Sequence, residues 1–308
     1  MSASATSSRV GLALALTTAV AWGTLPIALK AMLESMDAIT ITWYRFLAAA
    51  VLAGAWLRLK GRSLDLDTLD RRGRWLLALA VAGLLGNYVL YLMGLDFVPP
   101  GTAQIVIQLA PLFLLLGGMV FFGERFGRAQ WAGLGILVAG LLLFFNERLD
   151  QVVDVEGDYG RGVMIVMLAA VVWAAYALAQ KRLHSTLRSD AVLLVIYISA
   201  VPLLLPFSEP LLGAELSGAQ WWLLGYCCLN TLVAYGCFAE ALRHWEASRV
   251  SAVLALTPLL TLIFASLLEW AWPAYDSGER LNALSITGAL MVVAGSATCA
   301  LSGRRASP

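Results

Sequence analysis

Aromatic and amide side chains stand inside several long apolar stretches of the chain, at spacings that place them on one helix face. Asn87 and Tyr91 are four residues apart, and Tyr88 lies three residues before Tyr91. Aromatic rings offer stacking and edge contacts of about 0.5–1.5 kcal/mol each, and amides both donate and accept hydrogen bonds. Such residues suit an amphipathic ligand that has an aromatic ring and an amino and carboxylate head.

Side chains of the same types recur in other apolar stretches and together form a candidate substrate-binding set. Tyrosine and tryptophan also form belts at membrane interfaces, and asparagine and glutamine also join helices, so each residue alone has an ordinary structural explanation. We expect several of them to line one cavity. The candidates are Trp22, Asn87, Tyr88, Tyr91, Gln104, Gln108, Trp173, Tyr176, Asn230 and Tyr235.

Arg45 and three prolines are further candidates within the apolar stretches. Arg45 is the best candidate for a functional charge, with Glu34, Asp37 or a substrate carboxylate as its partner. Pro26, Pro111 and Pro258 each free a backbone carbonyl, which predicts hinges, with simple packing kinks as the alternative.

The composition indicates a membrane protein. Of the 308 residues, 60% are apolar and only 13% are charged, and the mean hydropathy is +0.78. A soluble domain of this length needs far more charge to stay dispersed. The net charge of +1 gives no field that would attract nucleic acid. Four cysteines stand in apolar runs without metal-ligand spacing, so we expect no metal and no cofactor.

Apolar runs of about 17–25 residues predict membrane-spanning helices, because a backbone in lipid must satisfy its hydrogen bonds within its own segment. The predicted fold is therefore all-α with ten transmembrane helices. Their ranges are 10–29, 38–57, 75–95, 102–122, 130–145, 162–180, 191–207, 220–242, 250–272 and 284–301.

The loops between these ranges alternate in charge. The even-numbered loops and the terminal segments carry most of the lysine and arginine, whereas the odd-numbered loops are poor in both and carry acidic residues such as Glu209 and Glu279. The positive-inside rule then places both termini in the cytoplasm of a multi-pass inner-membrane protein. A missed helix would reverse the charge pattern downstream, so the alternation supports the count of ten.

The two halves of the chain repeat one pattern. Three pairs of residues recur with unchanged spacing and in the same order, which indicates a duplication between 1–148 and 149–308. The first-half pairs are Trp22 and Lys30, Tyr88 and Pro111, and Gly133 and Gly140; their counterparts are Trp173 and Lys181, Tyr235 and Pro258, and Gly288 and Gly295.

Five helices in each half imply that the second half enters the membrane upside down. Inverted repeats around a central cavity are typical of secondary transporters, in which exchanging the shapes of the two halves gives alternating access. One chain already contains both halves, so it can work as a monomer surrounded by membrane lipid.

Three longer motifs can be compared with known families: AWGTLPIALK near the start, GLDFVPPGTAQIVIQLAPLF with the FFGE that follows, and ALRHWEASRVSAVLALTPLLTLIF in the second half. These motifs resemble the drug/metabolite transporter superfamily, EamA type. The resemblance covers nearly the whole chain and is greatest to the YddG-type aromatic amino-acid exporters. It implies a ten-helix fold, a central cavity and export of aromatic or hydrophobic amino acids or related metabolites. Ala174, where the first half has Gly23, departs from strict symmetry.

Other functional classes have weaker signals. Asp67 and Asp70 form one Asp-x-x-Asp that could hold Mg²⁺ in a membrane enzyme acting on a lipid or prenyl diphosphate, but a second such motif is missing. No filter-like segment favours a channel. Export of other metabolites or drugs stays open, and no acidic pair within the apolar runs provides a proton relay.

Overall fold

The computed structural model describes residues 3–61, 64, 66–123, 127–183 and 186–302, and every regular element within them is helical. The α-helices are α1 (Ala3–Leu33), α2 (Ala38–Leu59), α3 (Arg71–Phe97), α4 (Pro100–Val106), α5 (Leu109–Phe122), α6 (Arg128–Phe144), α7 (Leu149–Val153), α8 (Asp158–Leu183), α9 (Ser189–Leu204), α10 (Gly218–His244), α11 (Ala247–Leu254), α12 (Thr257–Ala271) and α13 (Ala283–Ser302). Short 3₁₀ helices span Leu66–Thr68, Leu205–Phe207 and Pro210–Glu215.

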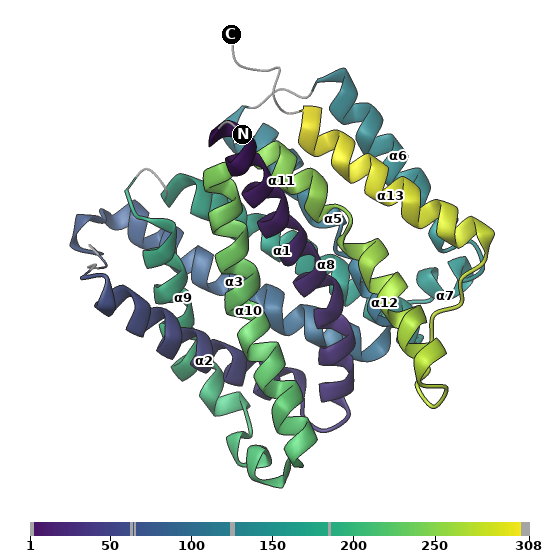
Figure 1. The fold of residues 1–308 in the computed structure, drawn as a ribbon, viewed down its shortest axis with the longest axis horizontal. Coiled ribbons are helices and arrows are strands. Elements are labelled where there is room, and N and C mark those ends of the chain that lie inside the picture. Colours follow the sequence, from purple (N-terminus) through teal and green to yellow (C-terminus); the bar gives the residue numbers. More distant parts are fainter. Residues whose placement is uncertain (1–2, 62–63, 65, 124–126, 184–185, 303–308) are drawn as a thin grey trace.

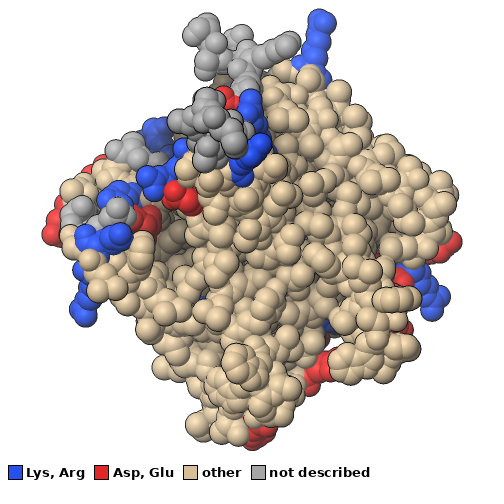
Figure 2. All heavy atoms as spheres, in the orientation of Figure 1, with Lys and Arg blue, Asp and Glu red and all other residues tan. Residues whose placement is uncertain are grey.

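Nine helical spans within the described residues are long and apolar enough to cross a membrane. Each coincides with one of the predicted ranges. The remaining predicted range, 130–145, falls on α6, which is apolar but has only 17 residues. Figure 2 shows a broad uncharged belt, with Lys and Arg gathered mostly along the upper left and Asp and Glu mostly toward the lower and right edges.

Helices from the first part of the chain pack against helices from the second part. α3 packs along α8, α1 along α10, and α6 along α13, as Figure 1 shows for the last two pairs. The α6–α13 contact is made at small residues: a Cβ on Gly133 would meet the carbonyl of Gly295, and one on Gly140 would meet the carbonyl of Gly288. This order of contacts makes α6 and α13 antiparallel, and the glycines let the two backbones touch.

Two predicted helices are broken, which corrects the expectation of continuous helices with a proline in the middle. Range 102–122 divides into α4 and α5 at Ile107–Gln108, and range 250–272 divides into α11 and α12 at Ala255–Leu256. Pro111 and Pro258 follow these breaks, within the first turn of α5 and α12. Proline has no N–H and its ring clashes with the carbonyl four residues earlier, so each helix stops and restarts.

The halves of these broken helices differ in how tightly they pack. Every residue of α4 is buried, and α4 packs against α12. By contrast, α5 packs mainly against α8 and is mostly half-buried. α11 packs against α13 and α1. Within the described residues, α5 and α11 make no contact comparable to that between α4 and α12. The molecule is thus packed more tightly at the α4–α12 end, which we call the sealed end, than at the α5–α11 end.

Candidate functional site

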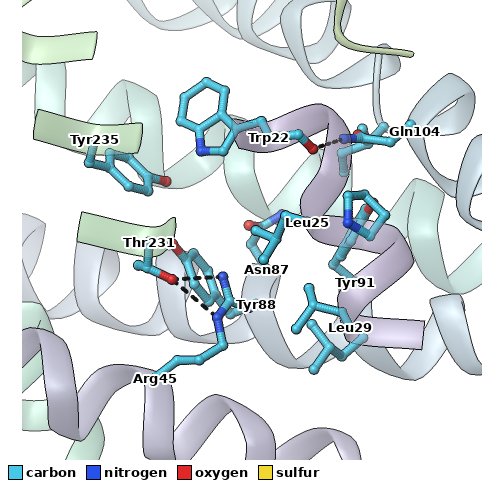
Figure 3. A pocket seen from close by; sticks show the side chains of 13 residues that line it. Trp22, Leu25, Leu29, Arg45, Asn87, Tyr88, Tyr91, Gln104, Thr231 and Tyr235 are labelled. Carbon is cyan, nitrogen blue, oxygen red and sulfur yellow. Dashed lines mark hydrogen bonds between the residues drawn. The ribbon is translucent and has the colours of Figure 1, made fainter. Parts of the chain in front are cut away.

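A cavity of about 130 Å³ lies between α1, α2, α3, α4 and α10 (Figure 3). One water needs about 10–15 Å³ of such space, so the cavity accommodates a solute of roughly ten non-hydrogen atoms. Residues on both sides of position 148 contribute to its wall. The lining residues are Trp22, Leu25, Pro26, Leu29, Arg45, Asn87, Tyr88, Tyr91, Leu92, Gln104, Ile107, Thr231 and Tyr235.

Arg45 is buried at one side of this cavity, with 3% of its surface exposed. Its Nε and Nη2 atoms donate to Thr231 Oγ1 at 3.2 and 3.0 Å, and its guanidinium lies 4.7 Å from the centre of the Tyr88 ring. The predicted carboxylate partners do not approach it: Asp37 caps α2 by accepting hydrogen bonds from backbone N–H groups, and Glu34 forms no ion pair with Arg45 within the described residues.

Pro26 bends α1 beside the cavity and leaves the carbonyl of Trp22, four residues earlier, without its helical donor. Gln104 Nε2 from α4 donates to that carbonyl at 2.9 Å. The flanking carbonyls also accept side-chain hydrogen bonds: Ala21 O from Asn230 Nδ2 at 2.7 Å, and Gly23 O from Thr261 Oγ1 at 2.8 Å. Three neighbouring helices therefore support the bend, as a helix in lipid requires.

Aromatic rings form a large part of the cavity wall. The rings of Trp22 and Tyr235 meet edge to face at 5.4 Å, and Trp22 also contacts Phe238 at 5.9 Å. Tyr88 is held between Arg45 and Phe46, whose ring centre is 4.7 Å from its own. The buried hydroxyl of Tyr91 has no hydrogen-bond partner among the described residues. Apolar surface, a cation and one unpaired hydroxyl thus converge on one small space.

Most of the predicted site residues line this cavity, but six of them do not. Gln108 donates instead to the carbonyl of Ala255 at 3.3 Å, and Asn230 joins α10 to α1. Trp173 and Tyr176 contact each other at 6.5 Å within a second core cluster. Residues outside the cavity lining are Gln108, Trp173, Tyr176, Asn230, Pro111 and Pro258.

Sequence analysis missed some of the wall. The aliphatic residues Leu25, Leu29, Leu92 and Ile107 line the cavity without any signal that separates them from ordinary core residues. Thr231 did have a signal, because it lies four residues before Tyr235 and so shares its helix face.

A second polar cluster lies at the sealed end, where the α12–α13 loop meets α4. Glu279 accepts hydrogen bonds from Thr102 N at 2.6 Å and from Thr102 Oγ1 at 3.3 Å. Arg148 donates to Gly278 O at 2.9 Å and lies over the ring of Tyr159. Burial raises the pKa of Glu279 to about 7, although the hydrogen bonds from Thr102 and the charge of Arg148 oppose that rise.

One carboxylate of the Asp-x-x-Asp motif has a structural role. Asp70 caps α3 by accepting a hydrogen bond from Gly73 N at 2.7 Å, as a helix-capping residue does. Within the described residues, no group of three or more His, Cys, Asp or Glu side chains is placed to hold a metal ion.

Comparison with known proteins places this architecture in a family. The sequence profile of the EamA-like transporter family matches residues 9–146 and again residues 160–300. The chain is 41% identical to the uncharacterized inner membrane transporter YhbE of Escherichia coli (strain K12), over 96% of this chain and 92% of that protein. It is 38% identical to an uncharacterized transporter of Haemophilus influenzae, over 95% of both.

More distant similarities point the same way. A probable amino-acid metabolite efflux pump of Escherichia coli (strain K12) is 26% identical over 92% of both chains. One crystal structure superposes with a TM-score of 0.63 and covers 97% of this chain and 99% of its own, at 19% identity, which shows the fold alone. Inner-membrane relatives and the many apolar helices together indicate a multi-pass inner-membrane transporter. The chain belongs to the EamA-like transporter family, the EamA type of the drug/metabolite transporter superfamily.

Proposed function

We propose that this chain is a secondary transporter that exports aromatic or hydrophobic amino acids, or related small metabolites, across the inner membrane. The observation that carries the proposal is the cavity, which combines aromatic rings with amide and guanidinium groups and has room for one small solute. Rings bind apolar side chains, and the polar groups match an amino and carboxylate head. The efflux-pump relative, though distant, supports an amino-acid metabolite as cargo.

Alternating access is the proposed mechanism, and the packing of α6 against α13 supports the inverted repeat that it needs. In the repeat, Gly133 corresponds to Gly288 and Gly140 to Gly295. Gly133 meets Gly295, and Gly140 meets Gly288, so each glycine touches the counterpart of the other. Two-fold related antiparallel helices make contacts of this kind. A family profile that matches the chain twice also favours two homologous halves.

Further contacts between the halves follow the same relation. Thr18 corresponds to Ala169 when Trp22 is matched to Trp173, and Asn87 corresponds to Ala234 when Tyr88 is matched to Tyr235. Thr18 Oγ1 donates to Ala234 O, and Asn87 Nδ2 donates to Ala169 O. The α1–α10 and α3–α8 interfaces are thus joined at equivalent places by different side chains.

We further propose that α6 is a tenth membrane span and that both termini face the cytoplasm. The basic even-numbered loops support this orientation. The α4–α12 end, next to the acidic α12–α13 loop, then faces the periplasm. In this orientation the structure is a conformer closed toward the periplasm and looser toward the cytoplasm.

A transport screen with purified protein in liposomes tests this function. Liposomes are loaded with unlabelled phenylalanine, tryptophan, leucine or alanine, and entry of the labelled solute in exchange is followed with and without a pH gradient. We expect aromatic amino acids to exchange fastest, relative to liposomes without protein. A pH gradient that raises the final accumulation would show proton coupling. Equal entry of every solute into both kinds of liposome would contradict the proposed function.

A further inference from the structure

Arg45 is a charged side chain deep inside the bundle. It lies seven residues into α2, which at a rise of 1.5 Å per residue is about 11 Å from the start of the helix. The other end of the helix, at Leu59, is further away still. Arginines near span ends extend their charge to the interface, but Arg45 points into the cavity instead (Figure 3).

The charge of Arg45 has no opposite charge beside it within the described residues. Both of its hydrogen bonds go to one neutral hydroxyl, that of Thr231, although a guanidinium has five N–H groups. Among the residues that the structure describes, the cavity wall contains no Asp or Glu. A buried cation without an opposite charge is costly, so a charged residue inside a membrane span is a candidate functional residue by default.

The surroundings of Arg45 hold the guanidinium in one place. Thr231 Oγ1 donates to Cys227 O at 3.0 Å, so the oxygen lone pairs of Thr231 are left to accept from Arg45. Tyr88 covers one face of the guanidinium. A second independent feature lies on the same wall: the buried hydroxyl of Tyr91 has no partner among the described residues and is available to a ligand.

From this we infer that Arg45 binds a carboxylate of the transported solute and that the cavity selects organic anions and amino acids over amines. The inference rests on the proposed function, because it assumes that the solute occupies this cavity. A planar guanidinium matches the two oxygens of a carboxylate. A solute with only an ammonium group would lie beside a fixed positive charge, and no acidic side chain among the described lining residues offsets that charge.

Binding of probes that differ only in their head groups tests this inference. Phenylalanine, 3-phenylpropionate and phenylalaninamide share the ring, and hexanoate and hexylamine repeat the comparison without one. We expect the three carboxylates to bind the purified transporter and the two amines without a carboxylate to bind at least about tenfold more weakly, since a charge-assisted hydrogen bond contributes about 1.5–3 kcal/mol. Ligand-induced thermal stabilisation measures each affinity.

Variants of α2 identify the residue responsible. Arg45→Gln should weaken binding of the carboxylates about 10- to 100-fold and should not weaken binding of the amines, because it also removes the positive charge that repels them. Arg45→Lys should fall between, because it keeps the charge but loses the planar fork. Arg58→Gln removes a positive charge from the exposed end of the same helix and should change nothing. The head-group comparison in the unmodified protein stands even where Arg45→Gln does not fold.

The outcomes separate this inference from the proposed function. Binding of hexanoate that depends on Arg45, without binding of any aromatic probe, would contradict the aromatic cargo and uphold the anion site. Amines that bind as tightly as their carboxylate partners, or no binding of any carboxylate, would overturn the inference. A uniform loss of all five affinities in Arg45→Gln and Arg45→Lys would also overturn it, because that pattern indicates a structural role.

Discussion

Trp22 and Trp173 occupy equivalent positions in the proposed repeat, yet of the two only Trp22 lines the cavity. Both side chains are half-buried, which makes the pair a matched comparison. We predict that Trp22→Leu weakens binding of phenylalanine about tenfold, because it removes ring contacts of about 0.5–1.5 kcal/mol and part of the buried apolar surface. Trp173→Leu should leave binding nearly unchanged. Exchange rates in liposomes measure both, and a larger loss in Trp173→Leu would contradict the assignment of this cavity.

The sequence predicted the position of a single side chain only where helical spacing alone determines which face of the helix it occupies. Helical periodicity placed Asn87, Tyr88 and Tyr91 on one face of α3, and all three line the cavity. Periodicity gives the face of a helix but not the neighbour that this face meets. Trp173 therefore looked equivalent to Trp22, although its face of α8 packs into a second core cluster.

The bend in helix α1 depends on hydrogen bonds that side chains of other helices donate to its carbonyls. Thr261 Oγ1 donates to Gly23 O, whereas the buried hydroxyl of Thr257, one turn earlier on α12, has no partner among the described residues. We predict that Thr261→Val lowers the free energy of unfolding by about 1 kcal/mol, because a buried carbonyl loses a donor. Thr257→Val makes the same chemical change at a hydroxyl without a described partner, so it should leave the free energy of unfolding unchanged or raise it slightly. Thermal unfolding in detergent measures the difference, and equal effects would contradict the role given to Thr261.

The contact between α4 and the α12–α13 loop should respond to pH through Glu279. Groups that face its carboxyl are Thr102 on α4, Arg148 after α6 and Tyr159 on α8, and Glu147 and Arg280 line the same small pocket. The pKa of Glu279 is raised to about 7 from an ordinary value of 4.5. The folded chain therefore holds this proton more tightly than the unfolded chain, so stability from this group falls as pH rises from 4.5 to about 7.

Substituting Glu279 separates this effect from other titrations. We predict that the unmodified protein unfolds at a higher temperature at pH 5.5 than at pH 7.5 by an amount that Glu279→Gln abolishes. The variant keeps an oxygen that accepts from Thr102 N but cannot ionise. The difference corresponds to about 1 kcal/mol, because the carboxyl is only half-buried and solvent partly screens it. An identical pH dependence in both proteins would exclude Glu279 as the titrating group.

The broken helices show what helical propensity alone leaves open. Prolines at 111 and 258 indicated an irregularity, but a proline is compatible with either a bend or an interruption. In α1 the helix continues through Pro26, because Gln104 supplies a donor for the released carbonyl. At Pro111 and Pro258 the chain instead begins a new helix. The outcome depends on donors from other helices, which lie far away in sequence.

At the scale of the molecule, the two halves of the proposed repeat are alike in some contacts but unequal in their packing. In that repeat, the α1–α10 interface corresponds to the α3–α8 interface. The equivalent of the α4–α12 contact would join α11 to α5. No comparable contact between these two helices is present among the described residues, and α11 packs on α13 instead. A symmetric sequence pattern cannot reveal which end is sealed, since both arrangements satisfy the same pattern.

This inequality gives the last prediction, on accessibility in membrane vesicles. Ala103 in α4 is completely buried, whereas Ala252 in α11 is half-buried and therefore partly accessible. Each is replaced by cysteine in a chain whose own four cysteines are changed to alanine. In the proposed orientation, a membrane-impermeant maleimide should label Cys at 252 from the cytoplasmic side and leave Cys at 103 protected from both sides.

Alternating access also predicts how labelling at these two positions changes when a transported solute is added. A transported solute that drives exchange of the two packings should open α4 from α12, so labelling at 103 should rise from the periplasmic side while labelling at 252 falls. Two-state exchange requires these changes to be opposite in sign, because one end seals as the other opens. Labelling that rises at both positions together would indicate loosening of the whole bundle, and unchanged labelling at both would indicate a static pathway.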